Sequence, residues 1–261
     1  MREVVILKWS FSPPNYFERP IKVVVSKNAN EEDITLLIKN GNVEARVNPI
    51  IYSHDPSCRL MLHEALNHRF LVEQVSTHRA YNLSKPLMYR QHPDGRMGVT
   101  IFPEPARAII RAVGCNILVK DMNGKVIRDT KRDRIERKQQ LGTLGEKHRS
   151  DKVLKALLNS YDSAVNDHAN ELVYLFEIQE AISARFQGDA AARRAVGLDE
   201  DEWPRLVALT NNALFMQGRH RGQKIGALRN ATSAELEEAR SIARRIIEGY
   251  LKWLDTKPRN S

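Results

Sequence analysis

The sequence predicts an α+β protein with an antiparallel β-rich domain over residues 1–130, a charged linker over residues 131–150 and an α-helical bundle over residues 151–261. Two features of the chain predict this order. Short apolar runs rich in β-branched residues fill the first half, whereas apolar residues recur at helical spacing beyond residue 150. Because domains most often have about 100 to 150 residues, a chain of 261 residues accommodates two of them.

The predicted strands of the first half are bounded by turn residues. Residues 4–9, 21–25 and 34–38 are short β-branched runs. Asn40 and Gly41 then form an Asn-Gly pair, which is the strongest short-range signal for a two-residue hairpin turn. After this pair, apolar and charged residues alternate over residues 43–47, as expected for a strand with one buried face.

Two more hairpins are expected further along the chain. Strands 87–91 and 97–102 flank Pro93-Asp94-Gly95, and strands 117–120 and 125–127 flank Asn123-Gly124. One short helix is expected over residues 104–112, after Pro103. The pattern of residues 60–75 favours neither a helix nor a strand. The first half is therefore predicted to be mainly antiparallel sheet.

The predicted linker lies in a charge-rich segment. Residues 125–152 carry ten Lys or Arg against five Asp or Glu, have little apolar periodicity and include Gly142 and Gly145. Such a charge run is typical of a solvated linker, and a dedicated binding site is the alternative interpretation.

One of the helices beyond residue 150 is expected to run from Asn166 or Asp167 to about Gly188, because its apolar residues form a single broad stripe. The stripe consists of Leu172, Leu175, Phe176, Ile178, Gln179 and Ile182. Other helices of the bundle are expected to cover it.

The last helix is expected to begin after Thr232 and to end before Pro258, because Thr232 and Glu235 have the spacing of a capping box. Its apolar residues repeat at steps of three and four residues: Leu236, Ala239, Ala243, Ile246, Tyr250 and Trp253. Its opposite face carries Arg240, Arg244, Arg245 and Glu248. This composition is typical of a solvated helix face.

The composition of the chain narrows the classes of protein. A formal net charge of +9 and a pI near 9.6 favour a polyanionic partner such as nucleic acid. Cys58 and Cys115 lie far apart without a CxxC motif, which excludes a disulfide framework and a cysteine-based zinc site. No apolar run approaches the roughly 20 residues that span a bilayer. We therefore expect a cytoplasmic protein without a membrane partner.

Charge is most unevenly distributed in residues 203–234, a 32-residue window that contains no carboxylate. At its centre, Gln217-Gly218-Arg219-His220-Arg221-Gly222 places cations between two glycines, which allow backbone amides to approach a ligand closely. The candidate phosphate-binding residues are Arg219, His220, Arg221, Lys224 and Arg229. Arginine forms bidentate contacts with phosphate, and His220 between two arginines could act as a general acid or base. The alternative is a basic loop that caps the preceding helix or pairs with acids such as Glu235 and Glu238.

Several motifs that would define another function are incomplete. His63 and His68 miss the HExxH zinc motif by one residue, so on a helix the two imidazoles point about 140° apart. Asp121, Asn123, Gly124 and Asp129 lack the remaining ligands of a calcium loop. There is no P-loop, no GxGxxG motif after a strand and no GxSxG motif. We therefore expect no cofactor and no metal.

Residues 190–208 have the spacing of a helix-turn-helix. Four carboxylates, Asp199 to Glu202, occupy the first turn of the would-be recognition helix, where they would repel DNA phosphates. Acids at this place are typical of a helix N-terminus, and Asp199 and Glu202 have capping-box spacing. A structural role is favoured over DNA binding.

The C-terminal helices, roughly residues 152–254, resemble the HEPN superfamily of compact helical bundles. The resemblance is based on the Asn211-Asn212 pair, followed by Arg219-His220 before the terminal helix. HEPN proteins often serve as ribonucleases or RNA-binding modules in bacterial defence and toxin systems. Their nuclease signature is an arginine, four to six residues and a histidine. The positions before His220 that would hold the arginine are Ala213, Leu214 and Phe215, so the resemblance implies a noncatalytic relative that binds rather than cuts.

These observations predict a binding protein for RNA or another phosphate-rich ligand, with a role in bacterial defence or stress response. The alternative is a protein-interaction or regulatory module in which the basic residues are incidental. If the chain is an enzyme, the residue chemistry points to a metal-independent ribonuclease that uses His220.

Overall fold

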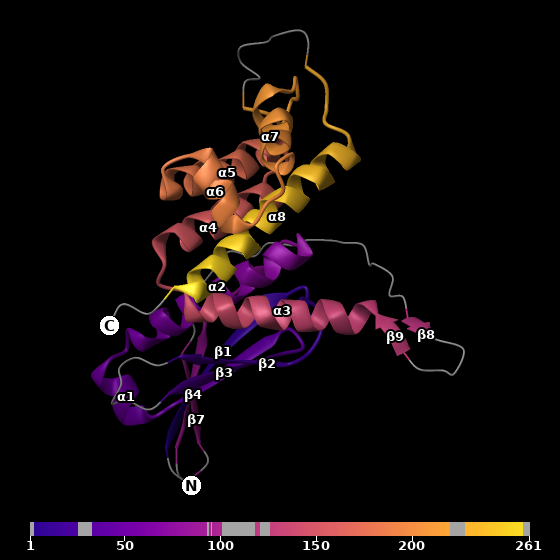
Figure 1. Cartoon of the computed structure of the whole chain (residues 1–261). Helices are drawn as coiled ribbons and strands as arrows, with labels where there is room; N and C mark the ends of the chain where they lie inside the picture. The colour runs from indigo at the N-terminus through magenta and orange to yellow at the C-terminus, as the bar shows by residue number, and fades with distance from the viewer. Residues whose placement is uncertain are drawn as a thin grey trace. The chain divides into compact units, whose positions relative to one another are not determined.

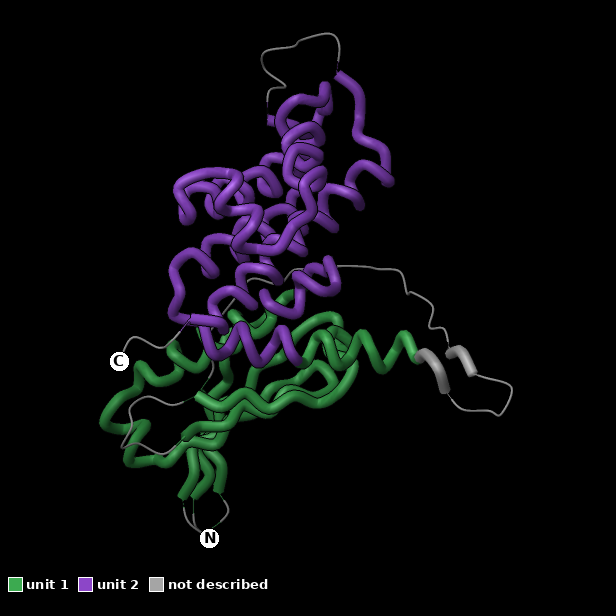
Figure 2. Tube along the Cα trace, viewed as in Figure 1, with its two compact units in different colours: residues 1–70, 81–139 green, residues 71–80, 140–261 purple. Residues whose placement is uncertain are grey.

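The computed structural model of the chain describes residues 3–25, 33–92, 94, 96–100, 118–120, 126–219 and 228–257 (Figure 1). It divides into two compact units. Unit 1 comprises residues 1–70 and 81–139, and unit 2 comprises residues 71–80 and 140–261 (Figure 2). The division falls inside two helices, α2 (Cys58–Thr77) and α3 (Thr130–Lys147), so each unit contains part of both.

Unit 1 contains a seven-stranded antiparallel sheet with the strand order β2-β3-β4-β1-β6-β7, and β5 pairs with the end of β1. Its strands are β1 (Val4–Ser12), β2 (Ile21–Val25), β3 (Ile34–Lys39), β4 (Asn42–Val47), β5 (Asn82–Leu83), β6 (Leu87–Gln91) and β7 (Met97–Thr100). A separate antiparallel pair is formed by β8 (Leu118–Lys120) and β9 (Val126–Asp129). The predicted α+β class is confirmed. The helix expected over residues 104–112 lies outside the described residues.

The predicted hairpin at Asn40-Gly41 joins β3 to β4. Both turn residues have positive φ, 49° for Asn40 and 79° for Gly41. Two consecutive positive φ values define the turn type whose twist matches paired strands, and asparagine and glycine adopt them most readily. The pairing of Lys39 with Asn42 therefore fixes the register of the central strands.

One face of the sheet packs against α2 to form the core of unit 1. Alternate residues of β1 are buried, and Leu62, Leu66 and Phe70 of α2 belong to the same apolar cluster. The ring of Tyr16 stacks on Phe70 at a centroid distance of 5.3 Å, and its hydroxyl donates a hydrogen bond to the Phe70 carbonyl. A short helix, α1 (Pro49–His54), precedes α2 and is capped by the side chain of Asn48.

Helix α2 occupies the segment for which the sequence favoured neither helix nor strand. Four of its polar side chains, His68, Arg69, Glu73 and Gln74, are buried. Polar residues at buried positions interrupt the apolar stripe by which an amphipathic helix is detected. His63 also has a structural contact, because its Nδ1 accepts a hydrogen bond from Trp9 Nε1 at 3.2 Å.

Unit 2 is helical. Its complete helices are α4 (Lys152–Asn166), α5 (Glu171–Phe186), α6 (Asp189–Val196), α7 (Glu202–Val207) and α8 (Ser233–Thr256), with short helical turns η1 (His168–Asn170) and η2 (Ala208–Asn212). Helix α5 packs against α4, α6 and α8. The apolar stripe predicted for α5 is buried at Leu172, Leu175, Ile178, Gln179 and Ile182. Among the described residues, no helix combines the length and the apolar content needed to cross a membrane.

The expected linker over residues 131–150 is instead mostly helix α3. Within unit 2, Leu141, Gly142 and Gly145 of α3 are buried. A Cβ atom added to Gly145 would lie 2.5 Å from Cγ2 of Val72 on α2. Gly145, one of the two glycines that suggested a flexible linker, therefore permits close helix packing. The scarcity of other buried residues on α3 explains the missing apolar periodicity.

The predicted capping box is present at the start of α8. The Thr232 side chain accepts a hydrogen bond from Glu235 N–H, and the Glu235 side chain accepts one from Thr232 N–H. The face of α8 expected to be solvated is partly buried, which corrects the prediction. The side chain of Arg240 is 18% exposed, and Glu248 is 7% exposed. Gly249 on α8 lies against the backbone of Val196 on α6, where an added Cβ atom would be 2.0 Å from the Val196 carbonyl oxygen.

Gly249→Ala is expected to destabilise unit 2 by about 1 to 3 kcal/mol, because the methyl group has no room beside the Val196 backbone. Replacing glycine by alanine at a helix position with free space would instead raise the free energy of unfolding by about 1 kcal/mol. The measurement is urea unfolding of the wild type and the variant, with the exposed Lys252→Ala on the same helix as the control. Equal or higher stability of Gly249→Ala would contradict the observed packing.

In unit 1, Glu18 accepts hydrogen bonds from Arg134 Nη2 and Lys138 Nζ of α3, each at 2.7 Å. The hydrogen bond from Arg134 is the main cause that lowers the pKa of Glu18 from 4.5 to about 2, against the opposing effect of burial. Because the pKa is lower in the folded state, the stabilisation is complete above pH 4.5 and is lost as the pH falls through about 2.

Glu18→Gln should therefore lower the free energy of unfolding by about 1 to 2 kcal/mol at pH 7 and have almost no effect near pH 2. The effect is reduced by solvent screening, since Arg134 is 39% exposed. Denaturant titrations across this pH range measure it, and Glu44→Gln, which removes a pair with the exposed Arg46, serves as the control. A pH-independent loss in Glu18→Gln would refute the assignment.

Candidate basic segment and its supports

The candidate phosphate-binding residues lie in residues 219–229, called the basic segment below. Its two ends are held together by the chain on either side. Arg229 N–H donates to the Leu214 carbonyl at 3.0 Å, and Met216 N–H donates to the Arg229 carbonyl at 2.9 Å. The Gln217 side chain accepts a hydrogen bond from Ala231 N–H at 3.1 Å. The two ends of the basic segment therefore meet at one place, called the closed base below, which consists of Leu214, Met216, Gln217, Arg229 and Ala231.

Gly218 has a structural explanation at this base. An added Cβ atom would lie 3.2 Å from the carbonyl oxygen of Phe215 and 3.6 Å from that of Thr210. Its N–H already donates to the Phe215 carbonyl at 3.0 Å. A Cβ atom at this position would therefore press against its own chain, which gives Gly218 a structural reason, while its proposed close approach to a ligand stays a prediction. Gly222 lies outside the described residues.

Arg219, at the start of the segment, is fixed by two residues of α5. Its Nη1 donates a hydrogen bond to Glu180 Oε1 at 2.8 Å, and its guanidinium lies over the ring of Phe176 at 4.9 Å from the centroid. The side chains of Arg219 and Glu180 are 44% and 51% exposed. Because exposed ion pairs contribute little stability, Glu180 is a partner that a stronger anion can replace.

Arg229, at the end of the segment, is fixed by α8 and by Phe215. It forms a bidentate pair with Glu235, at 2.6 and 2.9 Å, and lies 4.5 Å from the Phe215 ring centroid. Its side chain is 56% exposed. The hydrogen bond from Arg229, followed by that from Thr232 N–H, lowers the pKa of Glu235 from 4.5 to about 2. Arg229 is therefore held more firmly than Arg219, because its carboxylate is itself fixed by the α8 capping box.

His220, Arg221 and Lys224 lie outside the described residues. The pairing with acids that the sequence left open occurs at the described arginines of the window: Arg229 pairs with Glu235, and Arg205 pairs with Glu238. Glu180, the partner of Arg219, was not anticipated. It lies 39 residues from Arg219, so no local pattern relates the two.

A cleft of about 590 Å³ adjoins Arg219. It lies between α5, the turn from α5 to α6, and α7. Its lining residues are Phe176, Gln179, Glu180, Ser183, Ala184, Gln187, Gly188, Asp189 and Val207. Phe176 and Glu180, the two contacts of Arg219, are both among them, so the guanidinium contacts two residues of the cleft wall.

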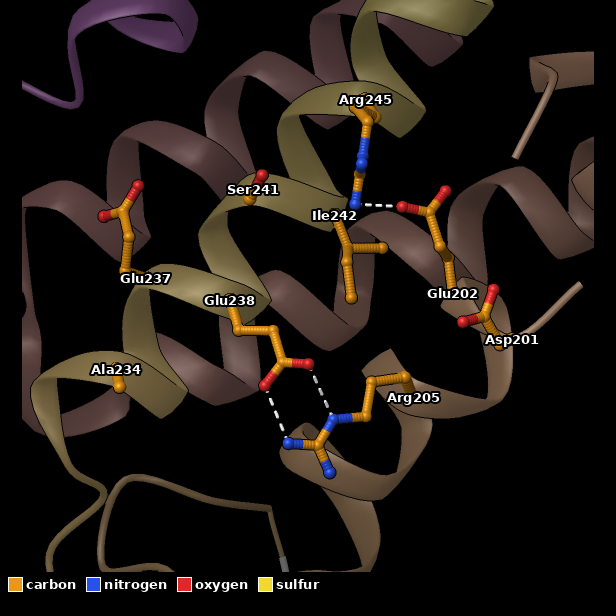
Figure 3. Close-up of a pocket in the computed structure, with 9 residues that line it drawn as sticks. All are labelled: Asp201, Glu202, Arg205, Ala234, Glu237, Glu238, Ser241, Ile242 and Arg245. Atoms are coloured by element: carbon orange, nitrogen blue, oxygen red, sulfur yellow. Dashed lines mark hydrogen bonds and ion pairs between the residues drawn. The ribbon is translucent and has the colours of Figure 1, made fainter. Parts of the chain in front are cut away.

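A second cleft, of about 490 Å³, lies between α7 and α8 (Figure 3). Its lining includes four carboxylates, from Asp201, Glu202, Glu237 and Glu238, but only two arginines. Both arginines are paired, Arg205 with Glu238 in bidentate geometry and Arg245 with Glu202. An excess of carboxylates makes this cleft unfavourable for a phosphate ligand.

The helix-turn-helix pattern corresponds to α6 and α7. Asp199 N–H donates to the Glu202 side chain at 3.2 Å, but the N-cap of α7 is Asp201, which makes no side-chain cap hydrogen bond. The capping box expected between Asp199 and Glu202 is therefore not the cap of this helix. Glu200 pairs with Arg193 of α6 at 3.0 Å. Glu200 and Glu202 thus have structural partners, in agreement with the structural interpretation of this segment.

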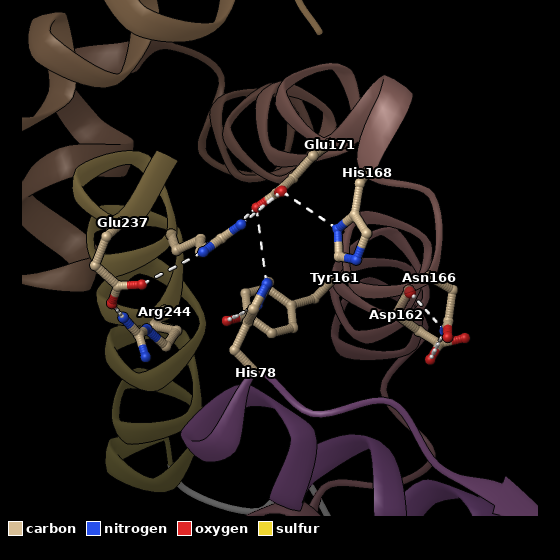
Figure 4. A network of polar contacts seen from close by, with 9 residues as sticks. His78, Tyr161, Asp162, Asn166, His168, Glu171, Glu237 and Arg244 are labelled. Atoms are coloured by element: carbon tan, nitrogen blue, oxygen red, sulfur yellow. Dashed lines mark hydrogen bonds and ion pairs between the residues drawn. The ribbon is translucent and has the colours of Figure 1, made fainter. Parts of the chain in front are cut away.

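A buried network joins α5, α8 and the end of α2 within unit 2 (Figure 4). Glu171, at the start of α5, is 1% exposed and accepts hydrogen bonds from Nε and Nη2 of Arg240 on α8. His78 Nε2 and His168 Nδ1 each lie 3.7 Å from one of its carboxylate oxygens. His78 Nδ1 also lies 3.1 Å from the hydroxyl of buried Tyr161, and burial raises the pKa of that phenol.

Glu171 and Arg240 were not identified from the sequence, although one signal was available for Glu171. It lies four residues before Leu175 and seven before Ile178, on the same stripe of α5. A carboxylate on an apolar stripe predicts a buried charge with a partner. Arg240 could not be identified as that partner, because 69 residues separate the two.

Comparisons of the chain with protein-family models, with curated proteins and with solved structures found no match.

Arg240→Ala is expected to destabilise unit 2 by about 3 to 5 kcal/mol, because it leaves the buried Glu171 carboxylate without its cation. The double variant Glu171→Met with Arg240→Met, which removes both charges, should lose less stability than Arg240→Ala. Arg244→Ala is the control, since its partner Glu237 is 56% exposed. Thermal and urea unfolding measure all three variants, and a harmless Arg240→Ala would show that the pair does not stabilise the bundle.

Proposed function

We propose that unit 2 binds RNA or another phosphate-rich ligand through Arg219, His220, Arg221, Lys224 and Arg229 of the basic segment. The observation that carries the proposal is the placement of its two described arginines. Arg219 and Arg229 are the first and last residues of the basic segment. Each guanidinium lies over an aromatic ring, and each side chain is about half exposed. Arginines with a restricted orientation lose less entropy when they bind phosphate.

The residues between these arginines add charge of one sign. Residues 219–229 contain no carboxylate and contribute Arg221 and Lys224, with His220 beside them. Phosphate can replace Glu180 at Arg219, because that ion pair is exposed on both sides. The proposed mechanism is therefore exchange of a protein carboxylate for a ligand phosphate, which releases counterions from the ligand.

We place this binding in a HEPN-like, noncatalytic helical domain of a cytoplasmic protein with a role in bacterial defence or stress response. Cleavage of RNA by His220 is a minor alternative. Loss of cleavage in His220→Ala with RNA binding retained is the result that would support it.

A protein-interaction module is the second candidate, and two observations favour it. Each described arginine of residues 203–234 has a carboxylate partner, which lowers the local positive charge. Leu214 and Met216 at the closed base are 37% and 49% exposed. A protein partner bound through these apolar residues would form a complex that depends little on salt.

The test is equilibrium binding of labelled oligouridylate RNA across a salt series. Arg219→Ala with Arg221→Ala should weaken binding and reduce the slope of log affinity against log salt by about 0.7 for each phosphate that the variant no longer binds. Arg205→Ala is the control, since Arg205 lies in the same window but outside the basic segment. An unchanged slope in the double variant would contradict the proposal.

Glu180→Gln and Glu235→Gln test the same anion exchange by removing the protein carboxylate instead of the arginine. Each should tighten RNA binding by freeing an arginine, and glutamine at position 235 can keep the capping-box hydrogen bond. If neither change alters affinity, phosphate does not compete for these arginines.

A further inference from the structure

The cleft beside Arg219 has features that a phosphate alone does not use. Its lining combines the half-buried ring of Phe176, the apolar side chains of Ala184 and Val207, and the amide of Gln179. Its volume of about 590 Å³ exceeds what a phosphate group needs. The described lining residues also include the carboxylates of Glu180 and Asp189 and no Lys or Arg, so a neutral planar ring with polar edges matches this lining better than a phosphate does.

Gln179 is the polar residue of this lining with an unused hydrogen-bonding atom. The residue is almost completely removed from solvent, since only 3% of it remains exposed. Its Nε2 donates to the Trp203 carbonyl at 3.4 Å, whereas its Oε1 accepts no hydrogen bond from any residue that the structure describes. A buried acceptor without a donor costs about 1 to 3 kcal/mol. Because Oε1 is itself closed to solvent, a ligand N–H group in the cleft would relieve this cost once the Gln179 amide turns toward it.

We propose that this cleft binds one unstacked nucleobase of a single-stranded RNA whose phosphate contacts Arg219. This inference rests on the proposed function and names its ligand class more closely. Arg219 contacts two residues of the cleft wall, so it can bind the backbone phosphate while the adjacent base enters the cleft. Single-stranded RNA can supply such a base, because its bases are free to unstack and pack against aromatic and amide side chains. A base in a duplex cannot reach Gln179 without leaving its stack.

The residues that hold Arg219 and the residues that hold Arg229 then have different roles. Phe176 and Glu180 hold Arg219 beside the cleft, so this end of the basic segment contacts both a phosphate and a base. Glu235 and Phe215 hold Arg229, and neither residue lines this cleft. Variants at lining residues without a contact to Arg219, such as Ala184, should therefore change the preference for bases without changing the salt dependence of binding.

The experiment compares two probes of equal length and charge, oligouridylate RNA and a ribose-phosphate oligomer that lacks bases. The wild type should bind oligouridylate about 5- to 150-fold more tightly, which is the range for one stacked base. Ala184→Trp fills the cleft from an exposed helix position and should abolish this difference while leaving the salt slope unchanged. Ala190→Trp, an exposed alanine outside the lining, is the matched control and should behave as the wild type.

The outcomes separate the two proposals. Equal, salt-dependent binding of both probes by the wild type would overturn the nucleobase site and leave the phosphate site intact. Retention of the preference for oligouridylate in Ala184→Trp would also overturn it. Binding of neither probe would refute the proposed function, and the nucleobase site with it.

Discussion

The burial of one carboxylate, that of Glu171, is the constraint on which the arrangement of unit 2 depends. A charge that is 1% exposed must be paired, and the bidentate contact with Arg240 fixes the start of α5 to α8. His78 and His168 approach the same carboxylate from the end of α2 and from η1. Apolar packing alone would allow small shifts between α5 and α8, whereas a bidentate ion pair allows one arrangement.

The same two helices hold the arginines of the basic segment. Helix α5 supplies Phe176 and Glu180 to Arg219, and α8 supplies Glu235 to Arg229. Fixing α5 to α8 therefore also fixes where the two ends of the basic segment lie. Each arginine is paired with a carboxylate when no ligand is bound. A ligand anion must therefore compete with that carboxylate for the arginine. Glu180 is the weaker competitor because it is exposed, whereas the capping box fixes Glu235.

Local patterns in the sequence were sufficient for the order of a sheet followed by helices and for several of the elements. The Asn40-Gly41 turn, the alternation in β4 and the capping box at Thr232 each involve residues close in the chain, and all three are present. The segment expected to be a linker forms helix α3, where tertiary packing replaces the local preference, as at Gly145 against Val72. At the candidate site, the arginines were identified by their unusual charge, but the partner of Arg219 was not. Arg219 and Glu180 are 39 residues apart, and the sequence alone does not show which acid faces which base.

The most direct measurement of the proposed anion exchange is an NMR titration of the wild-type chain with oligouridylate RNA that follows the side-chain Nε–H signals of Arg219 and Arg229. We predict that both signals shift at the same RNA concentration, with a larger change at Arg219, because its exposed pair with Glu180 is exchanged for phosphate. The Arg240 signal should stay in place, because its partner Glu171 is buried. Binding of RNA that leaves the signals of Arg219 and Arg229 unmoved would contradict this mechanism.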